Sequence, residues 1–82
     1  MDEELRLKVK NYIIETVQKY HGKKRFTPLE LEKKTLEAFT DSNVDKRDIK
    51  VIMRDIIDAG DLIYGFAAGS FVTIPEDKEN IK

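Results

Sequence analysis

Apolar residues recur at helical spacing in three stretches of the chain, and an uncharged hairpin pattern follows them. The first helical stretch begins after Asp2, a predicted N-cap, and is expected to stop at Gly22. Leu7 and Ile14 lie off its apolar stripe, and of two readings, a wider buried face or a small contact surface, we favour the wider face. The stripe consists of Leu5, Val9, Tyr12, Ile13, Val17 and Tyr20.

The second predicted helix has the best-marked start in the chain. Thr27 stands at the cap position, Pro28 at the first helical position, and Glu30 completes a capping box. Phe26 and Leu31 occupy the two positions of a hydrophobic staple around this start. The polar face of the helix is expected to be ordinary solvated surface and consists of Glu32, Lys33, Lys34 and Glu37.

The third predicted helix, residues 45–59, is capped by Asp45 and stopped by Gly60. Its apolar positions follow the spacing that commits one face to the core. They are Ile49, Ile52, Met53, Ile56 and Ile57. An uncharged ribbon of residues 62–66 and 70–74 follows, with Gly69 in a left-handed turn position and Pro75 ending the pairing.

Three helices followed by a hairpin is the order of a small winged helix, an α+β fold with a helix-turn-helix core and a β wing. In such a fold the residues around Arg25 and Phe26 are expected to join the hairpin as a short third strand. The chain has 82 residues, which is enough for one domain with one small core. We assign residues 1–75 to this domain and residues 76–82 to a polar tail.

Composition narrows the functional classes. The sequence contains no cysteine, its formal net charge is −1, and its start lacks the apolar core of a signal peptide. The uncharged run 62–75 is too short to span a bilayer, so we expect a soluble, cytoplasmic protein without a membrane partner. His21 is isolated, and no pattern of a nucleophile with a base, of metal ligands or of a phosphate-binding loop is present. We therefore expect no enzyme, no cofactor and no metal site.

Two groups of basic residues are candidates for contacts with nucleic acid. The first lies in residues 19–25 and contains Lys19, Lys23, Lys24 and Arg25 with no acid among them. It suits a phosphate backbone, and equally a solvated loop beside a helix C-terminus. The second group lies on one edge of the third helix and consists of Lys46, Arg47, Lys50 and Arg54.

The opposite edge of the third helix is acidic, with Asp48, Asp55 and Asp58. These acids would be repelled by phosphates or would face a basic partner. A charged, merely soluble surface is the plain alternative. Val51 lies between the two edges as the one exposed apolar position.

The hairpin carries three aromatic residues, Tyr64, Phe66 and Phe71, and no charge. Strict alternation does not let all three face the core of so small a sheet. An exposed ring there suits a protein partner or self-association. We expect at least two of the three rings to pack in the core, under the first helix.

Residues 46–53 (KRDIKVIM), residues 58–64 (DAGDLIY) and the run KKRF at the start of the second helix resemble a narrower group of winged helices. This group is the small D protein family of dissimilatory sulfite reductase systems. The resemblance departs at residues 36–44, where this chain is longer. It implies a cytoplasmic accessory protein near sulfite reduction that binds DNA or acts on the reductase, and it implies no catalytic residues.

Two functions stay open. The first is binding of duplex DNA, with the third helix in the major groove and residues 19–25 on the backbone; a homodimer would double the basic edge. The second is a protein-binding accessory or regulatory subunit that uses the uncharged wing and the polarised third helix. Its candidate contacts are Phe66, Phe71, Asp55 and Asp58. A continuous surface from the basic edge to residues 23–25 favours DNA, and exposed wing rings beside the acidic edge favour protein.

Overall fold

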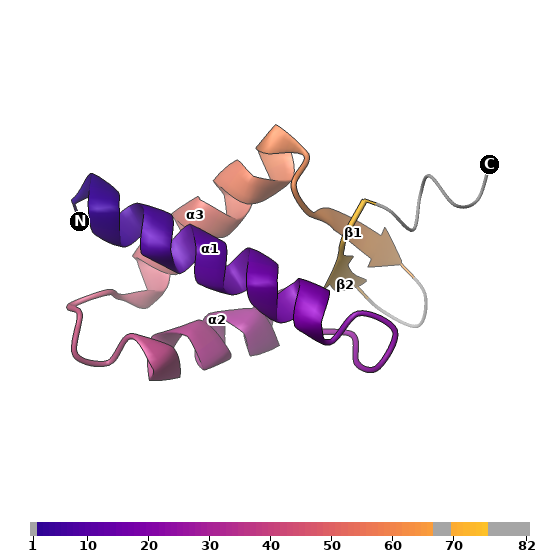
Figure 1. Ribbon diagram of the computed structural model, residues 1–82, viewed down its shortest axis with the longest axis horizontal. Helices are drawn as coiled ribbons and strands as arrows, with labels where there is room; N and C mark the ends of the chain where they lie inside the picture. Colours follow the sequence, from indigo (N-terminus) through magenta and orange to yellow (C-terminus); the bar gives the residue numbers. More distant parts are fainter. Residues whose placement is uncertain (1, 67–69, 76–82) are drawn as a thin grey trace.

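The structure is a computed structural model that describes residues 2–66 and 70–75, with the side chain of Phe66 left aside. These residues form three helices and one antiparallel hairpin (Figure 1). In order they are α1 (Glu3–Lys19), α2 (Pro28–Ala38), α3 (Lys46–Ala59), β1 (Ile63–Phe66) and β2 (Ser70–Thr73). The protein is a small α+β domain, and the element order is compatible with a winged-helix layout.

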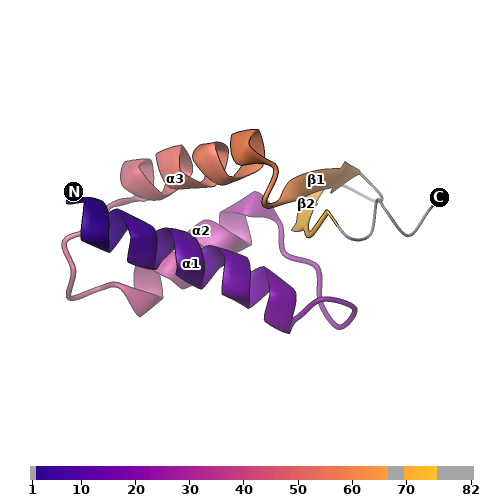
Figure 2. The same cartoon turned by 45° about the horizontal axis from the view of Figure 1, so that its top comes forward.

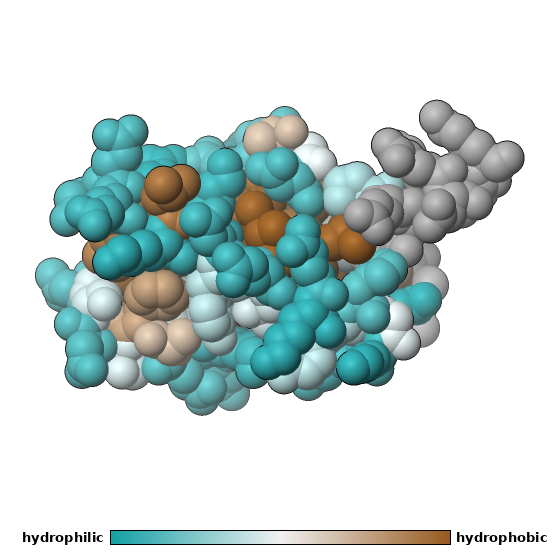
Figure 3. Space-filling model, viewed as in Figure 1, coloured by the Kyte–Doolittle hydropathy of each residue, from teal (hydrophilic) through white to brown (hydrophobic). Residues whose placement is uncertain are grey.

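Helix α1 packs against both other helices, and the hairpin lies beyond the C-terminal end of α3 (Figures 1 and 2). The core between these elements is apolar. Its buried side chains are Val9, Ile13, Val17, Phe26, Leu31, Ile49, Ile52, Met53, Ile56, Leu62, Val72 and Ile74. The outer face in Figure 3 is hydrophilic over most of its area, and apolar residues reach it in separate places.

The predicted start of α1 is confirmed, because the carboxylate of Asp2 accepts a hydrogen bond from the backbone N–H of Leu5 at 2.7 Å. The helix ends before Gly22, which takes a left-handed φ of 80° in the turn that follows. Ile14 packs against the core as expected. For Leu7 the wider-face interpretation is wrong: 56% of it is exposed, because α1 and α3 leave an open groove beside it.

The start of α2 is the predicted capping box. The Thr27 hydroxyl accepts from the backbone N–H of Glu30 at 3.2 Å, and the Thr27 N–H donates to the Glu30 carboxylate at 3.0 Å. The staple residues Phe26 and Leu31 are both buried. Their burial ties the entry of α2 to the core.

Glu32 corrects the expectation of a solvated polar face on α2. Its side chain is only 7% exposed, and its Oε1 has no hydrogen-bond partner among the described residues. The cause is helical spacing, since Thr35 and Leu36 lie three and four positions further and pack against the body of the protein. The side chain of Glu32 therefore lies on the buried side of α2.

Helix α3 begins and ends as predicted. Asp45 is the N-cap and forms a capping box with Asp48, and Gly60 ends the helix at a left-handed φ of 85°. Ile49, Ile52, Met53 and Ile56 are buried, while Ile57 is half-buried against the core. One face of α3 is thus committed to the interior and the other is left to solvent.

The hairpin pairs Tyr64 with Val72 and Gly65 with Phe71. The backbone N–H of Val72 also donates to the carbonyl of Phe26 at 2.8 Å, so the expected third strand exists as a single bridge. Neither Tyr64, 41% exposed, nor Phe71 belongs to the core, so the expectation that two of the three rings pack there is wrong. The Phe71 ring packs on Gly65 instead. The Gly69 turn and the tail 76–82 lie outside the described residues.

Candidate nucleic-acid interface

The basic edge of α3 points to solvent. Because Ile49, Ile52 and Ile56 hold the opposite face in the core, the cations three or four positions apart from one another stand on the outside. Its members Lys46, Arg47, Lys50 and Arg54 are all exposed. This set is the one that the sequence predicts.

The acids of α3 are largely engaged within the protein. The Arg6 guanidinium of α1 forms an ion pair with the Asp55 carboxylate, and both side chains are about half exposed. Asp45 and Asp48 bond to backbone N–H groups at the start of the helix. Among the described residues, Asp58 is the acid of α3 left without such a bond. Hydrogen bonds to neutral N–H groups leave the charges of Asp45 and Asp48 in place, so only the pair with Arg6 shifts the charge balance of this face toward positive.

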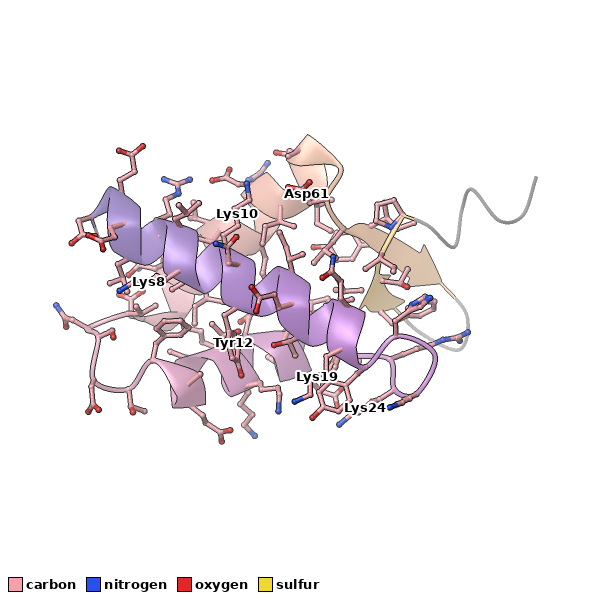
Figure 4. All side chains as sticks on the ribbon, in the orientation of Figure 1. Lys8, Lys10, Tyr12, Lys19, Lys24 and Asp61 are labelled. Carbon is pink, nitrogen blue, oxygen red and sulfur yellow. The ribbon has the colours of Figure 1, made fainter. Side chains whose placement is uncertain are left out.

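A second ion pair lies in the same seam between α1 and the end of α3. The Lys10 Nζ is 3.7 Å from the Asp61 Oδ2 (Figure 4). Like the pair of Arg6 and Asp55, it joins a cation of α1 to an acid on the other side of the seam. Sequence periodicity within one helix carries no signal for such pairs.

The predicted basic cluster 19–25 lies at the C-terminal end of α1 and in the loop after it (Figure 4). Three of its four cations lie over aromatic rings. Lys24 Nζ is 5.0 Å from the centre of the Phe26 ring, and the Arg25 guanidinium is 4.6 Å from that of Phe71. Lys19 of this cluster lies 5.7 Å from the Tyr20 ring centre. Aromatic rings therefore lie beside Lys19, Lys24 and Arg25.

Lys34 of α2 joins this cluster, which the sequence did not indicate. Its Nζ is also 5.7 Å from the Tyr20 ring centre. The ring of Tyr20 stands edge-on to that of Phe26, with the ring centres 5.4 Å apart. Lys34 is far from Tyr20 along the chain, and only the packing of α2 on α1 brings them together.

The charge of the basic loop affects the pKa of Glu30, at the start of α2. Three effects lower the pKa of the Glu30 carboxyl: first its hydrogen bond with the Thr27 backbone, then the nearby charge of Lys24, and last its hydrogen bond with the Thr27 side chain. The cluster thus helps to keep the capping box of α2 ionised.

The structure does not join the two basic groups. In both views the start of α3 lies at one end of the molecule and the loop 20–25 at the other, beside the hairpin (Figures 1 and 2). The arrangement that would favour a protein partner is not formed by Phe71 either, since that ring contacts Arg25 while Asp55 pairs with Arg6. The side chain of Phe66 is outside the described residues. The basic edge of α3 and the basic loop are separate surfaces.

Comparisons with known proteins find no match: no protein-family model, curated protein or solved structure matches the chain. Within residues 2–66 and 70–75, no helix has the length and apolarity that crossing a bilayer requires. His21, exposed in the basic loop, is not grouped with other potential metal ligands in that described part of the chain.

Proposed function

We propose that this protein is a small winged-helix module that binds duplex DNA through the exposed face of α3. The observation that carries the proposal is the ion pair between Arg6 and Asp55. It neutralises one acid of the opposite edge of α3, while Lys46, Lys50 and Arg54 have no ion-pair partner among the described residues. Because the charges of residues 45–59 sum to zero, offsetting one of the acids leaves a small excess of positive charge.

A helix with this face suits the major groove, which is about 12 Å wide and admits one α-helix. In this proposal Lys46, Lys50 and Arg54 contact phosphates or base edges along one side of the helix. Val51, 49% exposed, stands among them and is short enough to let the helix approach. The net charge of −1 adds no general attraction for DNA, so a dimer that doubles the basic edge would bind better.

The experiment is a salt titration of binding to a fluorescent mixed-sequence duplex, followed by anisotropy. Contact with phosphates makes log K fall linearly with log salt, by about 0.9 for each phosphate neutralised. Lys50→Glu should abolish binding, while Lys33→Glu, the same charge change on exposed α2, should weaken it little. Absence of binding at low salt, or equal losses in both variants, would contradict the proposal.

A protein-binding accessory role is the second candidate. Tyr64 stands exposed on β1, the outer strand of the hairpin, and no charged residue lies in either strand. An open strand edge with an exposed ring suits a partner that adds a strand or packs on the ring. The resemblance to the sulfite reductase D proteins makes the reductase itself the partner to test. This role would be favoured if the protein binds purified reductase but not duplex DNA, and if Tyr64→Ser abolishes binding to the reductase.

A further inference from the structure

The basic loop and β2 enclose a hollow that neither proposed function uses. Its volume is about 780 Å³, and it opens between residues 21–25 and residues 71–73. Ligand sites for small molecules commonly measure roughly 300–1,000 Å³. We name this space the basic hollow.

The lining of the basic hollow combines positive charge with an apolar floor. Lys23, Lys24 and Arg25 stand on the loop side, and the floor includes Val17 and Val72. Among the residues that the structure describes, no acidic side chain lines it. A ligand that fits must therefore bring negative charge and an apolar or aromatic part.

The side chains, rather than the loop backbone, provide the binding groups. The backbone N–H groups of Lys23 and Lys24 both donate to the Tyr20 carbonyl at 2.9 Å. They are satisfied and do not form an anion nest. Three cations remain to bind an anion, because among the described residues they have no ion-pair partner: Lys23, Lys24 and Arg25.

A flat cationic layer lies at the side of the hollow. The Arg25 guanidinium is 4.6 Å from the centre of the Phe71 ring. The ring lies so close to the backbone of Gly65 that a Cβ at that position would be 2.3 Å from it. Glycine therefore lets the ring lie against the sheet, where the guanidinium contacts it. Bases stack readily on arginine planes and aromatic rings.

We propose that the basic hollow binds a nucleotide, with the phosphate on Lys23 and Lys24 and the base on the layer of Arg25 and Phe71. The shared chemistry is a phosphate joined to a flat base, and either a free nucleotide or a single nucleic-acid strand supplies it. This site is separate from the face of α3 and does not depend on duplex binding there.

The test measures three ligands against the whole chain by isothermal titration calorimetry: inorganic phosphate, AMP, and a single-stranded oligo(dA). Amide chemical shifts recorded by NMR locate the site. We expect AMP or oligo(dA) to bind more tightly than phosphate, with shift changes at Gly22, Val72 and Thr73. Preference for oligo(dA) over AMP identifies a single strand as the source, and the reverse identifies a free nucleotide.

Variants separate stacking from charge. Arg25→Lys keeps the charge and removes the planar group, and it should weaken nucleotide binding roughly five- to hundredfold, the range that loss of one stacking contact produces. Phe71→Leu should weaken it similarly, and Lys33→Gln, which removes a charge on the exposed face of α2, should not. Thermal melting checks that each variant folds.

The proposal is overturned if phosphate binds as tightly as AMP, if Arg25→Lys binds as wild type, or if Lys33→Gln loses as much affinity as the loop variants. Lys50→Glu distinguishes the two sites. It should remove duplex binding and leave AMP binding unchanged.

Discussion

Arg6 of α1 forms an ion pair with Asp55 of α3, 49 positions later in the chain. The pair lies in the seam between the two helices. It adds little to stability, because an exposed ion pair contributes only about 0–1 kcal/mol. Its larger consequence is electrostatic, since it removes one negative charge from the face that we propose for DNA.

Replacing Arg6 tests that consequence directly. Arg6→Ala should change the melting temperature little and should weaken duplex binding several-fold, because the Asp55 carboxylate then repels phosphates. Lys8→Ala, an exposed cation of the same helix, is the matched control. Anisotropy titrations at one low salt concentration measure both. Equal losses in the two variants would mean that general charge, and not the masking of Asp55, sets the affinity.

The core face of α3 predicts a large loss of stability when it is truncated. Ile56 is fully buried, so Ile56→Ala should lower the free energy of unfolding by roughly 2–5 kcal/mol. Val51→Ala on the exposed face of the same helix should change it by less than about 0.5 kcal/mol. Urea denaturation followed by circular dichroism gives both values. A near-neutral Ile56→Ala would refute its place in the core.

The buried carboxylate of Glu32 predicts a gain. A buried polar atom without a partner costs about 1–3 kcal/mol, so Glu32→Leu should raise the free energy of unfolding by about 1 kcal/mol. Glu37→Leu, at an exposed position of α2, should have little effect. Denaturant midpoints compare the two variants with wild type. Destabilisation by Glu32→Leu would show that the carboxylate has a stabilising partner.

The capping box of α2 predicts a dependence on pH. Its hydrogen bond with the Thr27 backbone lowers the folded-state pKa of Glu30 below the ordinary value of 4.5, so folding favours the ionised carboxylate. That stabilisation is present above pH 4.5 and is lost as the pH falls through the folded-state pKa. Glu30→Ala should therefore lower the melting temperature at pH 7 and have less effect near pH 2. Glu37→Ala controls for general charge, and a difference that stays constant with pH would contradict the prediction.

The starts of the three helices and the end of α3 could be predicted from the sequence to within a residue or two. The side chain of each N-cap accepts a hydrogen bond from the backbone N–H three positions later, as in Asp2, Thr27 and Asp45. Gly60 ends α3 by taking a left-handed φ. Such bonds join neighbours along the chain, so residue type and spacing are sufficient to predict them. The buried stripe of α3 follows from periodicity for the same reason.

Tertiary structure alone decided the relations between elements. It buried Glu32, left Leu7 exposed, paired Arg6 with Asp55, and set Arg25 against Phe71. It also placed the start of α3, with the first cations of the basic edge, at the end of the molecule opposite to the basic loop. These outcomes depend on how helices cross and on which side chain meets which across a seam. The spacing of residues within one helix or strand is set by the local backbone, so it does not predict which side chains of two different elements come into contact.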